Sequence, residues 1–118
     1  MLLNQLDLIV KNVPEATAFF RDVLGLTVRF AEERFAELDA GGFTLMLSPD
    51  AMVPIPTHAA GVILHFQVAD VARALELART RGAKVLLEPT LTGWGTESAL
   101  VAGPEEVIID LYRPVASA

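Results

Sequence analysis

The sequence predicts an α+β fold in which one chain carries two βαβββ modules. Three observations lead to this class: an internal repeat, short runs of alternating apolar residues, and a Pro-rich segment between the two halves. We expect a single domain over residues 1–118, with the first module at 1–48, the connector at 49–61 and the second module at 62–118. At this length one compact domain has room for a real hydrophobic core.

The repeat consists of the segments "LIVKNVPEATAFFRDVLGLTVRF" and "HFQVADVARALELARTRGAKVLLE". Both run from an alternating stretch through Val and a capping residue into an amphipathic stretch, a Gly and a β-rich run. The matching pairs are Val10 and Val68, Asn12 and Asp70, Val13 and Val71, Ala16 and Ala74, and Gly25 and Gly82. The shared order favours two copies of one supersecondary unit.

In the first module, the alternating residues 5–10 predict a strand, and a helix follows it. Asn12 is placed to cap the helix, with Glu15 completing a capping box, and Gly25 fits the position just past the helix end. Strands are then expected at about 26–31, 34–39 and 43–48, with "DAGG" as the hairpin turn.

The second module repeats this order. A strand is expected at about 62–68, followed by a helix that Asp70 caps and Gly82 ends. Three further strands are expected at about 84–88, 97–102 and 106–112, with "AGPEE" turning between the last two. Between the modules, "PDAMVPIPTHAA" predicts a stiff non-helical connector, and its His58 is interpreted as a solvated loop residue.

Strand alternation predicts that one face of each sheet is aliphatic and packs on the helix, while the other face is mixed. A mixed face with apolar walls and a few polar groups is typical of a small-molecule pocket; the alternative is a face turned to solvent. The predicted lining consists of Gln5, Asp7, Thr44, Met46, Ile63, His65, Gln67, Asp110 and Tyr112.

Charge and composition exclude several classes of function. The formal net charge is −6, which disfavours nucleic-acid binding because such binding rests on clustered Lys and Arg. There is no cysteine, so disulfides, thiolate nucleophiles and sulfur-ligated metals are excluded. The first residues lack a signal-peptide pattern and the longest uncharged run is broken by prolines, so we expect a cytoplasmic protein without membrane contact.

Three segments resemble the vicinal oxygen chelate superfamily, which includes glyoxalases, bleomycin-resistance proteins and extradiol dioxygenases. They are "QLDLIVKNVPEATAFFRDVLGLTV", "VILHFQVADVARALELARTRGAKV" and "GPEEVIIDLYRP". The resemblance covers nearly the whole chain. It implies paired βαβββ modules whose sheets curl around a cup, a homodimer, and a small-molecule ligand in the cup.

In metal-dependent members of this family, the ligands come from the first and last strands of each module. The resemblance places these positions at Gln5, Met46, Ile63 and Asp110. Met46 and Ile63 are unsuited to a divalent ion, and His65 lies two residues from the ligand position, about 6–7 Å along the strand. We therefore expect neither a bound metal nor another cofactor.

The role of His65 stays open between a structural ion pair and an acid–base pair. The resemblance implies that Asp7 and His65 meet at the cup's centre with Asp110 nearby, so the candidate catalytic residues are His65 and Asp7. Trp94, between two glycines, is interpreted either as a flap residue that stacks on a planar ligand or as an anchor of the dimer.

Three functions follow in order of preference. The first is a metal-free protein that sequesters an apolar or aromatic ligand, with Trp94 added to the lining residues. The second is a metal-independent lyase or isomerase that uses His65 as general base, with Asp7 or Asp110 orienting the ring. The third is a divalent-metal glyoxalase or dioxygenase.

Overall fold

The computed structural model describes residues 1–54 and 61–116. The chain divides into two compact units, Met1–Ala59 and Ala60–Ala118, which are described one at a time. His58 and part of the predicted connector lie outside the described residues.

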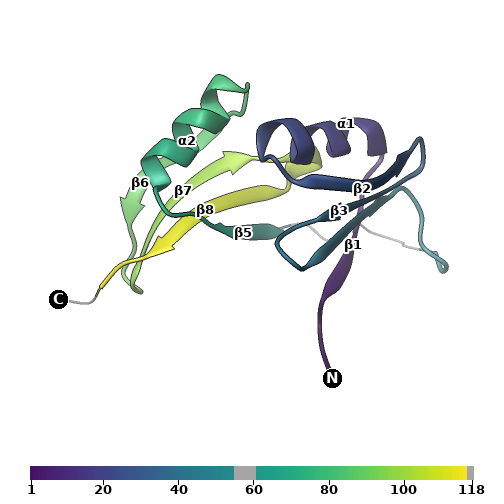
Figure 1. Ribbon diagram of the computed structural model, residues 1–118, viewed down its shortest axis with the longest axis horizontal. Helices are drawn as coiled ribbons and strands as arrows, with labels where there is room; N and C mark the ends of the chain where they lie inside the picture. Colours follow the sequence, from purple (N-terminus) through teal and green to yellow (C-terminus); the bar gives the residue numbers. More distant parts are fainter. Residues whose placement is uncertain (55–60, 117–118) are drawn as a thin grey trace. The chain divides into compact units, whose positions relative to one another are not determined.

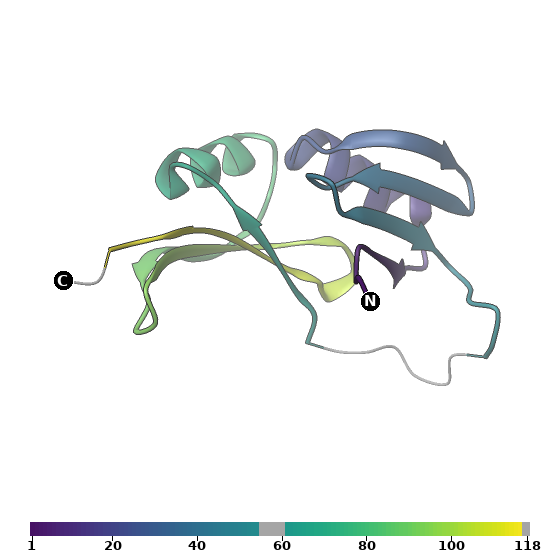
Figure 2. The same ribbon diagram turned by 60° about the horizontal axis from the view of Figure 1, so that its bottom comes forward.

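The first unit is a four-stranded mixed sheet with one helix on one face (Figure 1). Its strands are β1 (Gln5–Ile9), β2 (Thr27–Glu32), β3 (Phe35–Asp39) and β4 (Thr44–Ser48). The spatial order is β1-β4-β3-β2, with β1 parallel to β4 and the other pairs antiparallel. Figure 2 shows these strands side by side with the helix behind them.

The helix of the first unit begins as the sequence predicts and then changes its hydrogen-bonding pattern. Asn12 caps α1 (Val13–Ala18) by accepting a hydrogen bond from the Glu15 backbone N–H at 2.9 Å. The next turn, Phe19–Val23, is π-helical and directs the fully buried Phe20 into the core. Gly25 follows with φ of +77°, the left-handed conformation predicted for it.

The second unit repeats this topology. Its elements are β5 (Ile63–Gln67), α2 (Val71–Thr80), β6 (Val85–Leu91), β7 (Thr96–Ala102) and β8 (Ile108–Pro114). The spatial order is β5-β8-β7-β6, with β5 parallel to β8. Asp70 caps α2 by accepting from the Arg73 backbone N–H at 3.0 Å. Two βαβββ modules are therefore confirmed.

β6 runs three residues beyond its predicted end and includes Pro89. The strand tolerates proline because β6 is the edge strand of its sheet. Its outer side has no neighbouring strand, so the N–H that proline lacks is not needed for a hydrogen bond there. Its pairing with β7 shifts register twice, between Val85 and Leu87 and between Leu87 and Thr90.

The core of each unit lies between its sheet and its helix. Of the strand residues predicted to face the helices, Leu8, Val10, Leu45, Leu47, Ile109 and Leu111 are buried, whereas Leu6, Leu64, Phe66 and Val68 are partly exposed. Ala36 and Leu38 complete the buried strand residues of the first unit, which pack with Val13, Ala16 and Phe20; Ala99 and Val101 do so in the second, with Val71, Leu75 and Ala78.

Among the described residues, the two helices are both too short to cross a lipid bilayer.

Candidate functional site

The candidate site lies on the face of the second sheet that is turned away from α2. The register of β5, β8 and β7 arranges this face in three rows that run across the strands. The rows are Ile63, Ile108 and Ala102; then His65, Asp110 and Leu100; then Gln67, Tyr112 and Ser98. An apolar row therefore adjoins the row of His65 and Asp110 on one side, and a row of two polar residues and one aromatic residue adjoins it on the other; such a mixture of apolar and polar groups is expected of a ligand-binding surface.

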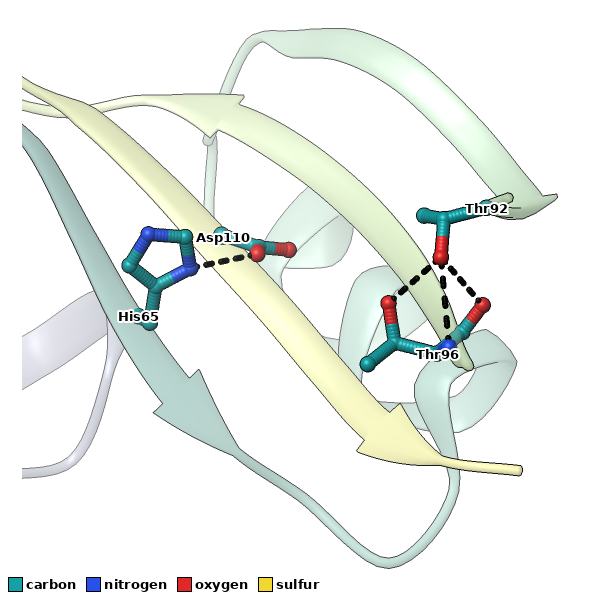
Figure 3. Close-up of polar contacts among 4 residues, drawn as sticks. All are labelled: His65, Thr92, Thr96 and Asp110. Carbon is teal, nitrogen blue, oxygen red and sulfur yellow. Dashed lines mark hydrogen bonds and ion pairs between the residues drawn. The ribbon is translucent and has the colours of Figure 1, made fainter. Parts of the chain in front are cut away.

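His65 and Asp110 are the central pair of this face. They are direct neighbours across the parallel strands β5 and β8, and the His65 ring points at the carboxylate (Figure 3). His65 Nδ1 lies 2.7 Å from Asp110 Oδ2, within the range of a strong charge-assisted hydrogen bond. The contact orients the imidazole and leaves Nε2 directed away from Asp110.

Burial of the two partners is very unequal. The His65 side chain is 60% exposed, whereas the Asp110 side chain is only 9% exposed. Asp110 Oδ1 is buried and has no hydrogen-bond partner among the described residues. A carboxylate held in this way normally accepts several hydrogen bonds, so the lone contact with His65 is unusual for a purely structural residue.

Tyr112 completes the aromatic part of the site. Its ring meets the His65 ring edge-on, with the centroids 6.1 Å apart and the planes at 82°. This geometry is one that aromatic pairs prefer, and it restricts rotation of the imidazole.

Trp94 lies at the tip of the hairpin between β6 and β7. Thr92 Oγ1 accepts a hydrogen bond from the Trp94 backbone N–H at 3.4 Å. It also accepts from the Thr96 backbone N–H at 3.2 Å and contacts Thr96 Oγ1 at 2.9 Å (Figure 3). Gly95 follows with φ of +89°, so the turn depends on glycine there. The hairpin thus presents a side chain that is 80% exposed, and both interpretations of Trp94 stay predictions.

The remaining predicted site residues belong to the first unit. Gln5 pairs with Thr44 and Asp7 with Met46 across β1 and β4, so all four lie on the face opposite α1. Glu37 of β3 is the next residue in the row of Asp7 and Met46. Since Asp7 and His65 belong to different units, the predicted contact between them stays a prediction; the partner that the structure gives His65 is Asp110.

The four positions that would carry a metal in this family are poorly suited to one. Gln5 and Asp110 offer oxygen donors, but Met46 offers a thioether and Ile63 offers no donor at all. Asp110 moreover uses one carboxylate oxygen on His65. Within residues 1–54 and 61–116, no group of three or more His, Asp or Glu side chains is arranged to hold a metal ion.

Open hollows of the first unit occur elsewhere and do not contain the predicted lining. One of about 370 Å³ is bounded by Pro49–Pro54, and another of about 330 Å³ lies beside Thr17, Arg21 and Glu32. Neither contains a residue of the predicted lining, so neither tests the sheet face as a ligand site.

Sequence reasoning missed Ser98, Leu100 and Glu37 as members of the two open faces. The alternation of β7 was sufficient to find the first two, because Ala99 and Val101 point to the helix and their neighbours must point away. Which strand lies beside which was needed to place them next to Tyr112 and Asp110.

Known proteins place this architecture in a family. The model of the Glyoxalase/Bleomycin resistance protein/Dioxygenase superfamily matches residues 2–111. The chain belongs to this superfamily, as its resemblance to the vicinal oxygen chelate proteins predicted. No curated protein matches the sequence closely enough to count as a relative.

Solved structures agree with this assignment. A structure described as a conserved domain protein is 42% identical with a TM-score of 0.87, covering 97% of this chain and 99% of that one. A glyoxalase/bleomycin resistance protein/dioxygenase from Nocardioides is 17% identical with a TM-score of 0.80, covering 100% and 86%. TnmS3, an antibiotic binding protein from Streptomyces sp. CB03234, is 20% identical with a TM-score of 0.77, covering 97% and 96%. The last two likenesses concern the fold alone.

Proposed function

We propose that the protein binds a small apolar or aromatic molecule without a metal ion and sequesters it. The observation that carries this proposal is the open face of the second sheet, where Ile63 and Ile108 lie on one side of the polar pair His65 and Asp110, and Leu100 lies beside Asp110 in the same row. Apolar surface supplies the affinity for such a ligand, and a few fixed polar groups orient it. The antibiotic-binding description of TnmS3, which shares the fold, supports the same class of function.

The metal-free part of the proposal rests on donor chemistry. A divalent ion bound at the family's positions needs several nitrogen or oxygen donors at about 2.0–2.2 Å, and the side chains of Met46 and Ile63 do not supply them. We therefore assign no step to a metal ion and treat Gln5 and Asp110 as polar groups, each on the open face of its own unit.

The test uses Trp94, the single tryptophan of the chain, as the reporter. Purified protein is screened against a library of aromatic compounds by quenching of tryptophan emission, and each hit is checked by equilibrium dialysis and for product formation. We expect saturable binding, unchanged ligand after recovery, and less than stoichiometric metal by elemental analysis. Conversion of a bound compound, or one equivalent of Ni, Zn, Mn or Fe per chain, contradicts the proposal.

A second function is favoured by one specific observation, the 2.7 Å contact between His65 Nδ1 and Asp110 Oδ2. An imidazole oriented by a carboxylate is the usual form of a general base, and such a base contributes about 10²–10⁴-fold to a rate. In this alternative the protein is a metal-independent lyase or isomerase, with Asp110 in the orienting role.

The two functions separate in the variant His65→Ala. For an enzyme, turnover of a converted library compound falls by about 10²-fold or more while its affinity is largely retained. For a binding protein there is no turnover to lose, and affinity alone changes. Loss of affinity with unchanged turnover per bound substrate contradicts the assignment of His65 as base.

A further inference from the structure

The structure assigns a chemical class to the anchoring group of the ligand: a neutral, weakly acidic hydroxyl, such as that of a phenol or enol, hydrogen-bonded to His65 Nε2. This inference rests on the proposed small-molecule binding and deepens it. It follows from which imidazole nitrogen carries the proton, which group on the face is accessible, and which charges surround it.

The contact with Asp110 determines the tautomer of His65. Imidazole is a stronger base than a carboxylate, so the shared proton resides on Nδ1 and donates to Asp110 Oδ2. A neutral imidazole protonated at Nδ1 has its lone pair at Nε2, which makes Nε2 a hydrogen-bond acceptor. The open face therefore offers an incoming ligand an acceptor, and a ligand with a donor group is its complement.

The accessible member of the pair is the ring. With its side chain 60% exposed, His65 can be reached from the open face, whereas the Asp110 side chain is 9% exposed. The edge-on contact with Tyr112 restricts the ring on one side. The side chains of Leu100 and Ile63 lie on the same face and suit an apolar or aromatic body attached to the donor.

The charge of Asp110 indicates whether the ligand's anchoring group is a neutral hydrogen-bond donor or an anion. Its Oδ1 is buried without a partner among the described residues, so the hydrogen bond from a neutral His65 ring leaves the carboxylate negatively charged beside the ligand's anchoring group. A carboxylate ligand accepts only and would have to be met by a protonated ring. A weakly acidic hydroxyl binds without protonation of the ring, because it donates its hydrogen bond to Nε2 of the neutral imidazole.

The test compares two probes that differ in the donor alone, 7-hydroxycoumarin and 7-methoxycoumarin, by equilibrium dialysis at pH 7.0. Replacing the hydroxyl hydrogen by methyl removes the hydrogen bond and keeps the aromatic body. We expect the wild-type protein to bind the hydroxyl probe about 5–10-fold more tightly, the range for one hydrogen bond made in a partly exposed site.

Two variants test whether the preference for the hydroxyl probe depends on His65 and Asp110. His65→Ala removes the acceptor, and we expect both probes to bind equally. Asp110→Asn is close in size to the wild type, but its amide can either accept from Nδ1 or donate to it, so the tautomer is no longer imposed and the preference falls to near unity. The control Glu97→Gln makes the same carboxylate-to-amide change on the opposite face, beside Arg113, and is expected to retain the full preference.

Each outcome is decisive. Equal binding of the two probes by the wild type overturns the hydroxyl anchor and leaves sequestration of small molecules standing. A preference that persists in both His65→Ala and Asp110→Asn is steric and also overturns the anchor. Failure of both coumarins to bind overturns it as well, and the library screen with Trp94 then decides separately whether the protein binds small molecules at all.

Discussion

Asp110 lowers the stability of the fold and is also a central residue of the candidate site. It lies in the middle of β8 on the open face of the sheet and is nevertheless buried, like its neighbours Ile109 and Leu111 on the helix side. Its Oδ1 is buried without a partner among the described residues, and burial of an unsatisfied acceptor costs about 1–3 kcal/mol. A residue that lowers stability in this way is typical of a functional site.

This conflict leads to a prediction about stability. Asp110→Val removes the unpaired acceptor from a strand that favours β-branched residues, and we expect the free energy of unfolding to rise by about 1 kcal/mol. His65→Val, in contrast, removes the hydrogen bond to Asp110 Oδ2, and we expect the free energy of unfolding to fall by about 1 kcal/mol. Urea unfolding followed by Trp94 emission or circular dichroism measures both changes.

The opposite signs make the prediction specific to the carboxylate. If Asp110→Val destabilises the protein more than His65→Val does, then Asp110 supports the fold and the case for a functional carboxylate weakens. Glu97→Val, which leaves the part-buried Glu97–Arg113 ion pair without its acid, serves as the comparison for loss of an ordinary carboxylate from the same sheet.

At the scale of the elements, the sequence was sufficient for the existence and type of every predicted strand and helix, and for the inner face of β1, β4, β5 and β8. The reason is that periods of two and 3.6 residues and the caps Asn12 and Asp70 are local properties. The π-helical turn at Phe19–Val23 was not predicted, because its hydrogen-bond pattern has no signal in residue type.

The candidate site was predictable in part for the same reason. Alternation placed His65 and Asp110 on the open face of their strands, but it did not state that β5 and β8 are neighbours in this register. Pairing between strands far apart in sequence depends on the packing of the whole unit. The sequence therefore predicted that His65 and Asp110 share the open face of the second sheet, and the structure supplied the contact between His65 Nδ1 and Asp110 Oδ2; that these residues bind a ligand stays a prediction.

The turn before β8 gives the prediction that belongs to this scale. The backbone N–H of Gly103 donates to the Val107 carbonyl at 2.7 Å, and a Cβ built on Gly103 would lie 2.9 Å from that same oxygen. Gly103→Ala forces the turn to shift, and we expect a loss of about 1–3 kcal/mol in the free energy of unfolding. Gly93→Ala is the matched control, because a Cβ there meets no atom within 4 Å and Gly93 lacks a positive φ. Equal effects of the two substitutions in thermal or urea unfolding would show that the turn is not tightly packed.

For the whole molecule, the dominant property is its acidity. The formal net charge is −6 and the isoelectric point is near 4.7, so an anion approaching the protein is repelled at neutral pH. Two glutamates of the second unit are locally balanced, because Glu88 pairs with Arg79 and Glu97 pairs with Arg113. The repulsion of an anionic ligand therefore comes from the overall charge and acts over a long range. The expected homodimer stays a prediction, to be measured by sedimentation.

The long-range charge predicts how binding depends on salt and on ligand charge. Between 0.01 and 0.1 M salt the screening length falls from about 30 to about 10 Å. The affinity for an anionic probe, 7-hydroxycoumarin-3-carboxylate, should therefore rise about two- to threefold over this range, whereas that for neutral 7-hydroxycoumarin should stay constant. Equilibrium dialysis at several salt concentrations measures both. Anionic binding that instead weakens with salt would indicate a cationic site, as a protonated His65 ring would form, and would contradict a neutral hydroxyl as the anchoring group.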